Sequence, residues 1–149
     1  MLHANADRDQ ILTTLAPLCQ GIDRDILQDF VTRMDPDYFS AFPPKTLAAH
    51  VKQAATLTPD HPCDVSIEDT AGGHFVITIV AYDYFSEFAA ICGLLSAFGL
   101  NIEEGRIFTS AESEQPLRSR SANPYPIRTR PQGRPGLTRK KIVDVFTVS

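Results

Sequence analysis

Residues 82–109 read YDYFSEFAAICGLLSAFGLNIEEGRIFT, and this stretch decides the fold. Residues 74–82, HFVITIVAY, run into it, and their apolar, β-branched composition predicts a β-strand. Apolar residues then recur at helical spacing over residues 84–98, which predicts an amphipathic helix. Gly99 is expected to end this helix, because glycine readily takes the positive φ found just past a helix end. A second strand is predicted over residues 100–109.

The predicted helix and the strand before it offer matching apolar surfaces. One face of the strand is wholly apolar and the other is mixed, so we expect the helix to cover the first. Gly93 lies within the helix although glycine is unfavourable there, and a close approach of helix and sheet would explain it. The residues expected to meet are Phe85, Phe88, Ile91, Cys92, Leu95 and Phe98 of the helix with Phe75, Ile77 and Ile79 of the strand.

Two more strands are predicted on either side of this unit. Residues 140–149, KKIVDVFTVS, are expected to pair with residues 74–82 and to separate them from residues 100–109. Residues 63–68 alternate apolar and polar side chains and precede a hairpin-type turn, DTAGG, at residues 69–73. This early strand can occupy the free edge of the sheet.

Residues 1–58 are predicted to form a short helical segment, joined by a linker at residues 59–62 to a domain at 63–149. Asp23 can N-cap one helix, which the Asp-Pro pair at residues 35–36 ends, since the residue before proline avoids the α region. The helices contain few large residues, so we expect them to pack against another domain.

The order of elements and several short motifs resemble the ACT domain. Asp83 lies at the first turn, the second turn reads GLNI, and the last two strands contain RIFT and DVFTV. The pattern is most similar to the ACT domain of PII uridylyltransferases and glutamine-synthetase adenylyltransferase-like nucleotidyltransferases. Residues 30–58 are more loosely similar to the segment that precedes it there, with an aromatic pair, Tyr38-Phe39, before a helix that carries a histidine, His50.

This resemblance implies an α+β fold, in which the helical segment precedes an incomplete ferredoxin-like (β-α-β-β) ACT sheet. A complete ACT domain has a second helix and a fourth strand, so the chain is expected to be a fragment of a longer protein. If the chain is not a fragment, its N-terminal helices or a partner must cover the sheet. The implied function is regulatory: sensing an amino acid such as glutamine, or coupling subunits, in a nucleotidyltransferase of nitrogen control. A homodimer through the sheet or the helices is implied as well.

The resemblance also implies a ligand site at the first turn, facing the start of the second strand across a dimer interface. The residues carried over are Asp83, Tyr84, Phe85, Ser86, Asn101 and Ile102. The family's Asp-x-Pro-Gly reads Asp-Tyr-Phe-Ser here, and without glycine the backbone approaches a ligand less freely. The alternative is that Asp83 caps the helix and that the Asn101 side chain hydrogen-bonds to the backbone of its own turn. The chain would then be a protein-interaction or dimerisation module without a small ligand.

Catalytic, metal and cofactor residues are not assigned. The sequence contains no Gly-Ser followed by paired aspartates, no His-Asp metal dyad and no phosphate-binding G-x-x-x-x-G-K-[ST] loop. Glu103 and Glu104 are adjacent on a predicted strand and are expected to point to opposite faces, so they do not form an acid–base pair. For His50 a packing role is favoured over a ligand or catalytic role. Whether the parent protein is an enzyme stays open.

Charge is distributed unevenly along the chain. Residues 1–105 carry 15 acidic and 5 basic side chains, whereas residues 106–141 carry 9 basic and 2 acidic ones. Most of these bases fall in a Pro-rich segment, residues 110–138, which is predicted to be a flexible loop. No aromatic platform accompanies them, so a nucleic-acid partner is not expected. The chain has no long apolar run and no signal-peptide pattern, and its three cysteines are far apart. A cytoplasmic protein is therefore predicted.

Overall fold

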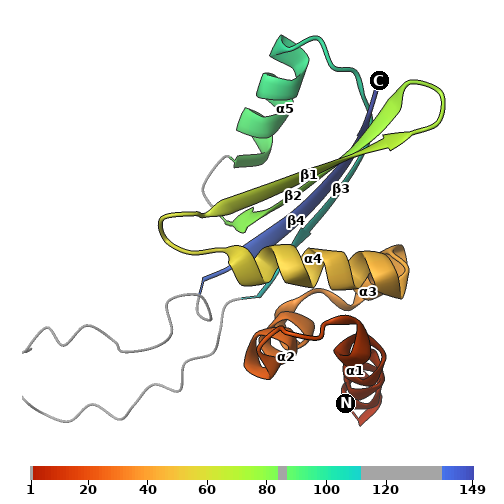
Figure 1. Cartoon of the computed structure of the whole chain (residues 1–149), viewed down its shortest axis with the longest axis vertical. Helices are drawn as coiled ribbons and strands as arrows, with labels where there is room; N and C mark the ends of the chain where they lie inside the picture. The colour runs from red at the N-terminus through yellow and green to blue at the C-terminus, as the bar shows by residue number, and fades with distance from the viewer. Residues whose placement is uncertain (1, 84–86, 112–138) are drawn as a thin grey trace, which may run out of the picture.

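In the computed structural model of this chain, residues 2–83, 87–111 and 139–149 are described. Helices come first and lead into an antiparallel sheet, so the α+β class is confirmed (Figure 1). The predicted loop at residues 110–138 lies, from residue 112 on, outside the described residues. The elements are α1 (Leu2–Leu15), a 3-10 turn η1 (Ala16–Leu18), α2 (Arg24–Arg33), α3 (Pro36–Ala41), α4 (Pro44–Thr56), β1 (Cys63–Thr70), β2 (His74–Tyr82), α5 (Glu87–Ala97), β3 (Ile102–Thr109) and β4 (Lys141–Val148).

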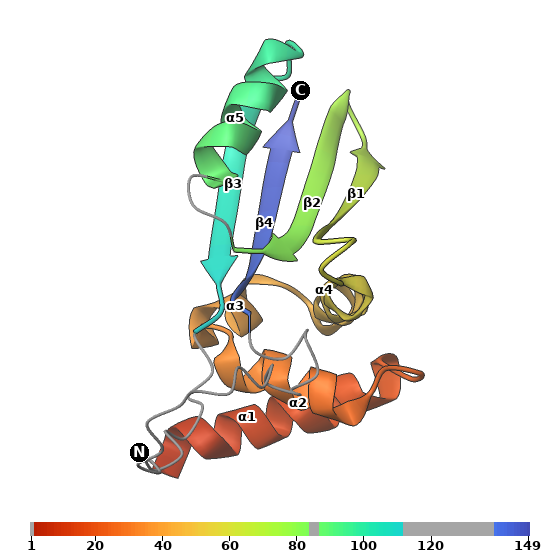
Figure 2. The same ribbon diagram turned by 90° about the vertical axis from the view of Figure 1, so that its left-hand side faces the viewer.

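The four strands are arranged in the order β1-β2-β4-β3, and each neighbouring pair is antiparallel. The predicted pairing of the strand at 74–82 with the strand at 140–149, and not with the strand at 100–109, is confirmed. β1 forms a hairpin with β2 and takes the free edge beside it, which was one of the alternatives left open by the sequence. Figure 2 shows the sheet from the side of α5, with β4 between β2 and β3.

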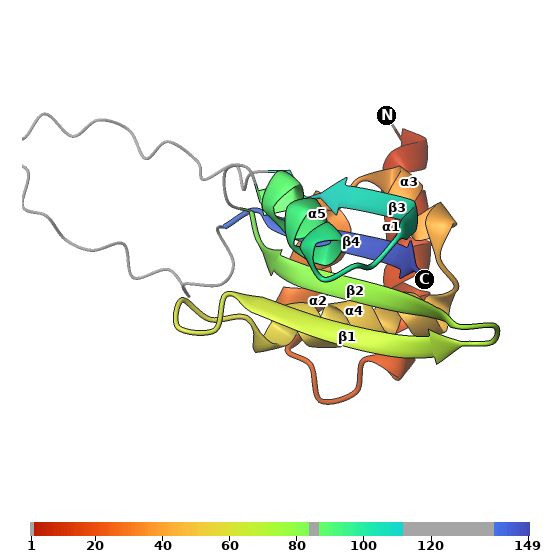
Figure 3. The ribbon, with the colours of Figure 1, turned by 90° about the horizontal axis from the view of Figure 1, so that it is seen from above.

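The two faces of the sheet are covered by different helices. α5 lies on one face, and α4 lies on the other, with α1 to α3 beyond it (Figure 3). The core on the α4 face joins the helical segment to the sheet, because one cluster of buried residues contains α1 to α4 side chains together with Val80, Tyr82 and Val143. On the α5 face the buried residues are Ile77, Ile79, Ala81, Ile142, Phe146 and Val148, against which Ile91, Cys92 and Leu95 of α5 pack.

The predicted apolar stripe of α5 is correct in its centre and wrong at its ends. Phe88 is 47% exposed and Phe98 is 78% exposed, whereas both were predicted to be buried. Phe88 lies at the rim of the interface, where its ring stacks on Phe146 with centroids 6.2 Å apart. A Cβ at Gly93 would meet no atom within 4 Å, so the expected close approach of helix and sheet there is wrong. Phe85 lies outside the described residues.

Phe88→Ala is therefore expected to cost about 1–2 kcal/mol in unfolding free energy, because only about half of the ring is removed from water. Phe146→Ala is the matched control: Phe146 is 1% exposed, so its truncation should cost about 3–5 kcal/mol. Urea unfolding of both variants measures the difference. Equal costs would mean that Phe88 is as buried as its stacking partner.

The end of α5 matches its sequence signal. Gly99 has φ +78°, which L-residues with side chains rarely adopt. The N–H of Leu100 donates to the Leu95 carbonyl at 3.0 Å, and the N–H of Gly99 donates to the Ser96 carbonyl at 3.0 Å. These two bonds form the motif that commonly closes a helix at glycine and turns the chain into the next strand.

In the helical segment the predicted caps are confirmed and one helix was missed. The Asp23 carboxylate accepts a bond from the Asp25 N–H at 3.0 Å and caps α2, which ends at Arg33 before the Asp-Pro pair. The six-residue α3 follows at once, capped by Asp35, whose side chain accepts a bond from the Asp37 N–H at 2.9 Å. Because α3 begins at Pro36, Tyr38 lies in the core on the α4 face, where it is fully buried.

Candidate functional site

The residues predicted to bind a ligand at the first turn are only partly described. Asp83 follows β2, its side chain is exposed, and its backbone N–H donates to the Lys140 carbonyl at 2.9 Å. Asn101 precedes β3, is exposed, and exchanges two backbone hydrogen bonds with Ser149, at 2.9 and 3.0 Å. Ile102 is half-buried and packs on the core beneath α5. Tyr84, Phe85 and Ser86 lie outside the described residues.

A single chain does not bring these two halves of the predicted site together. Tyr82 pairs with Lys141 at the start of β4, and Ile102 pairs with Val148 at its end. Asp83 bonds Lys140 and Asn101 bonds Ser149 at the other end of the strand, so at about 3.4 Å per residue roughly 30 Å separates the two. A site that includes both residues therefore needs a second copy of the chain, as the prediction of a dimer interface assumed.

A second concentration of polar side chains lies on the opposite face, in a groove of about 500 Å³ between α4 and the sheet. We call this the α4 groove. All four strands and one face of the helix contribute to it, so its residues are scattered along the sequence. They are Phe42, Lys45, Thr46, Ala49, His50, Gln53, Ser66, Glu68, Val76, Thr78, Glu104, Arg106, Val145 and Thr147.

His50 is the most deeply buried polar side chain of the groove, with 2% of its surface exposed. Its Nδ1 lies 2.7 Å from the hydroxyl oxygen of Tyr38, which is itself fully buried. Burial lowers the pKa of His50 to about 4, so the imidazole is neutral at pH 7. Burial likewise raises the pKa of Tyr38, so the phenol keeps its proton.

The hydrogen bond between these two rings fixes where the imidazole proton lies. If Tyr38 donates to Nδ1, the hydroxyl proton and Nδ1 are paired with each other and the His50 proton is on Nε2. If Nδ1 donates instead, the Tyr38 hydroxyl proton has no acceptor among the described residues, which would cost about 1–3 kcal/mol. The first tautomer is therefore favoured, and it places the imidazole proton on Nε2.

Gln53 lies three residues after His50, on the same side of α4. Its Nε2 is buried and has no hydrogen-bond partner in the part of the chain that the structure describes. Buried amide groups are ordinarily paired with protein or with water, and this nitrogen is an exception that is itself shielded from solvent.

The charges around the α4 groove are of both signs. Arg106 donates to the Glu104 carboxylate at 2.9 Å and to the Ala41 carbonyl at 3.1 Å, and its guanidinium lies over the Phe42 ring. Lys45 and Glu68 form no ion pair with any described residue. The groove thus carries two cations and two anions, of which one of each sign is unmatched.

A β-bulge in β3 brings Glu104 to this side of the sheet. The register shifts between Ile102 and Glu104, and the Glu103 carboxylate lies 3.2 Å from Nδ1 of His74 while Glu104 pairs with Arg106. His74 belongs to the α4 face of β2, so both carboxylates reach the same face. The expectation that Glu103 and Glu104 point to opposite faces is therefore wrong, because the bulge inserts a residue into the alternation.

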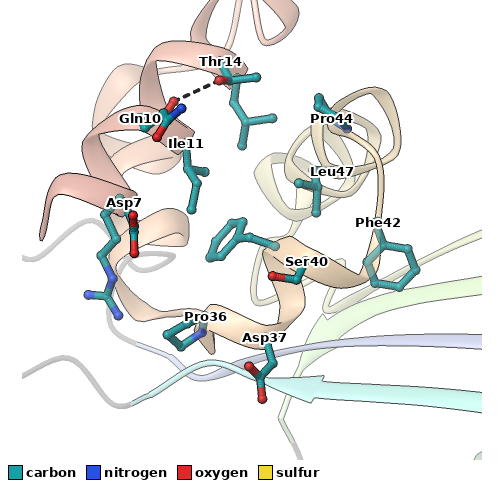
Figure 4. A pocket seen from close by; sticks show the side chains of 13 residues that line it. Asp7, Gln10, Ile11, Thr14, Pro36, Asp37, Ser40, Phe42, Pro44 and Leu47 are labelled. Carbon is teal, nitrogen blue, oxygen red and sulfur yellow. Dashed lines mark hydrogen bonds between the residues drawn. The ribbon is translucent and has the colours of Figure 1, made fainter. Parts of the chain in front are cut away.

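A hollow of about 480 Å³ lies between α1, α3 and the start of α4 (Figure 4). Ile11 of α1 and Leu47 of α4 lie on its opposite walls, and Asp7 and Asp37 lie at its rim. The ring of Phe42 lines both the hollow and the α4 groove. Its lining is mixed: apolar side chains of α1, α3 and α4 lie beside the polar residues Arg8, Gln10, Thr14 and Ser40.

A buried ion cluster joins α2 to β4 and belongs to the architecture. The Asp29 carboxylate lies 3.3 Å from Arg33 and 3.9 Å from the Lys141 Nζ, and Arg33 also donates to the Ala111 carbonyl at 2.8 Å. Burial lowers the pKa of Lys141, an effect that Asp29 opposes and the Arg33 charge reinforces. The shared carboxylate stabilises both cations and holds the helix against the end of the sheet.

Within the described ranges, no group of three His, Cys, Asp or Glu side chains is placed to hold a metal ion. In the same ranges, no helix has the length and hydropathy needed to cross a bilayer. No protein-family model matches this chain, and no curated protein matches it in sequence.

Proposed function

We propose that this chain is a regulatory module of the ACT type, which senses an amino acid or couples subunits in a nucleotidyltransferase of nitrogen control. The observation that carries the proposal is the strand order: β2, α5, β3 and β4 follow one another in sequence, and β4 lies between β2 and β3. This order is the one expected of a ferredoxin-like sheet, with β1 at the edge that the fourth strand would occupy, and it supports the proposal.

The proposed ligand site lies between two copies of the chain. Asp83 and Asn101 are at opposite ends of β4, so an amino acid that contacts both has to bridge Asp83 of one copy and Asn101 of the other. Asp83 offers an exposed carboxylate to an ammonium group, and Asn101 offers a side-chain amide to a carboxylate. Ligand binding and dimerisation would then be linked, since each raises the equilibrium constant of the other.

Calorimetric titration of the full chain with L-glutamine and the other standard amino acids tests this proposal. We expect saturable binding by a dimeric sample and loss of that binding in Asp83→Ala, whose exposed side chain can be removed without harm to the fold. Light scattering after gel filtration, with and without the ligand, gives the oligomeric state. A folded dimer that binds none of these amino acids, or binds them equally well as Asp83→Ala, contradicts ligand sensing at the turn.

A second candidate function, a docking module without a small ligand, is favoured by the exposed apolar surface on the α5 side. Of the eight large apolar side chains exposed in the described part of the chain, seven lie on α5 or on the strand face that it covers. Surfaces of this kind mark protein–protein contacts. The calorimetric titration with amino acids separates the two candidates, because a docking module without a small ligand would give no binding heat. The seven residues are Val65, Ile67, Phe75, Phe88, Leu94, Phe98 and Ile107.

A further inference from the structure

The outer edge of β1 is an open strand edge. β1 lies along the outside of the sheet (Figure 3), and its eight residues pair with β2 in one unbroken register, from Cys63 opposite Ala81 to Thr70 opposite His74. The other edge strand, β3, is interrupted by a bulge after Ile102. Bulges, prolines and short lengths ordinarily keep the edges of sheets from pairing with other chains, and β1 has none of the three.

The backbone groups that face this edge follow from the hydrogen bonds of β2. The Tyr82 N–H donates to the Pro62 carbonyl at 3.0 Å, so the even-numbered residues of β1 direct their backbone groups toward β2. Successive residues of a strand bond to alternate sides, and the N–H and C=O groups of Val65, Ile67 and Asp69 therefore point away from β2. They form no hydrogen bond with any described residue. These are the groups to which an added strand would bind.

The side chains on one face of this edge are apolar. Val65 and Ile67 lie opposite Ile79 and Ile77 of β2, on the α5 face, and they are 51% and 65% exposed. Residues directly opposite each other in an antiparallel pair share a face. Apolar side chains of an added strand would therefore lie beside these two residues and remove part of their surface from water.

The other face of this edge is acidic. Asp64 and Glu68 alternate with Ser66 on the α4 face, and β1 contains no lysine or arginine. Glu68 forms no ion pair with any described residue, although Lys45 lines the same groove, and Asp64 lies 3.9 Å from His61. Basic side chains of an added strand would lie opposite these carboxylates. A second copy of β1 fits poorly, because pairing centred on Ser66 puts Asp64 opposite Glu68 of the other copy, and like charges directly opposite are destabilising.

We propose that the edge of β1 binds an extended segment of a partner protein by antiparallel strand addition. In this segment apolar residues alternate with lysine or arginine. The apolar residues lie beside Val65 and Ile67 and bond to the backbone of β1, and the basic residues lie beside Asp64 and Glu68. The inference goes beyond both functions proposed above, because it depends neither on an amino-acid ligand nor on a second copy of the chain.

The probe is a fluorescent peptide as long as β1 in which valine and lysine alternate, and fluorescence anisotropy with the full chain gives its Kd. A peptide with glutamate in place of lysine is the charge control. In antiparallel addition the valine N–H groups face β1 and the lysine N–H groups face away. N-methylation of two valines should therefore raise the Kd about tenfold or more, whereas N-methylation of two lysines should leave it unchanged.

Three variants of the chain test the edge itself. Glu68→Lys should raise the Kd of the lysine peptide about fivefold or more, because an attractive cross-strand pair becomes repulsive. Asp9→Lys makes the same charge change at an exposed position of α1 and is the matched control, with a change below about twofold at physiological salt. Ile67→Pro removes an N–H that β2 does not use, so circular dichroism should show an intact fold while peptide binding is lost.

The proposal is overturned if the lysine peptide does not bind at millimolar concentration, if the glutamate peptide binds as tightly, or if N-methylation of the lysines abolishes binding and that of the valines does not. Light scattering after gel filtration tests for a second copy at the edge. A homodimer that Ile67→Pro dissociates would overturn the proposal as well. Amino-acid binding at the turn should be unchanged in Ile67→Pro, so failure of the strand-addition site and failure of ligand sensing are distinguishable.

Discussion

Tyr38→Ala is expected to lower the unfolding free energy by about 3–5 kcal/mol, which is the usual cost of deleting a fully buried aromatic ring. The Tyr38 ring is fully buried and lies 5.1–5.9 Å, centroid to centroid, from its neighbours. Small domains have only about 5–15 kcal/mol of stability, so the loss would be a large part of the total. The rings that surround it are Phe30, Phe39, Phe42, His50 and Phe108.

Tyr38→Phe separates the ring from its hydroxyl. It keeps the packing and removes the bond to Nδ1 of His50, which leaves a buried acceptor without a donor and should cost about 1–3 kcal/mol. Urea unfolding followed by circular dichroism measures both variants. If Tyr38→Ala lowers the unfolding free energy by less than about 1 kcal/mol, removal of the ring leaves no cavity, and the described core is then wrong.

The consequences of Tyr38→Ala should extend to the sheet. Phe108 of β3 touches both Tyr38 and Phe42, with centroids 5.2 and 5.8 Å away, so the aromatic cluster connects α3 and α4 to an edge strand. The sequence predicts that the helical segment packs against another domain. In the structure it shares a hydrophobic core with the sheet.

Local signals were sufficient for most of the elements. The apolar, β-branched composition of residues 74–82, the cap at Asp23 and the positive φ at Gly99 each depend on chemistry within a few residues, and the structure contains the strand, the cap and the turn. The pairing of β2 with β4 could be predicted as well, because a helix that returns to the same sheet leaves room for a strand between the two that it connects.

Features that depend on contacts distant in sequence could not be predicted. Phe88 and Phe98 have the right helical phase to be buried, but α5 packs on the sheet only near its centre, so both rings stay exposed. The bulge at Glu103 has no glycine signature, and α3 is too short to show a helical period. For the two phenylalanines the sequence pattern was present and the packing partner was not where the pattern assumed it, whereas the bulge and α3 left no pattern to follow.

The α4 groove was missed for the same reason. Its polar residues come from one helix and four strands, and no short motif unites them. Two signals were available: His50 on the apolar side of its helix, close in sequence to Tyr38, and the mixed face of the strand at 74–82. Either alone is compatible with a packing histidine and a half-exposed strand, and only the fold places them opposite each other.

Acidification is expected to destabilise the protein through His50. The native pKa of His50 is lowered by burial to about 4, whereas the unfolded chain has the usual value near 6.5. The stabilisation from keeping the imidazole neutral is complete above pH 6.5, and it is lost as the pH falls from there to about 4, because only the unfolded state binds the proton in that window. At about 1.36 kcal/mol per pH unit, the loss from this one group approaches roughly 3 kcal/mol.

His50→Phe isolates this effect, because carboxylates and the other histidines titrate equally in both proteins. The variant pays a constant cost for the lost bond to Tyr38, and its free energy of unfolding should fall less steeply than that of the wild type between pH 6.5 and 4. Urea unfolding of both proteins at several pH values gives the difference curve. Parallel curves would mean that burial does not lower the pKa of the native His50, and the expected acid destabilisation through this residue would be wrong.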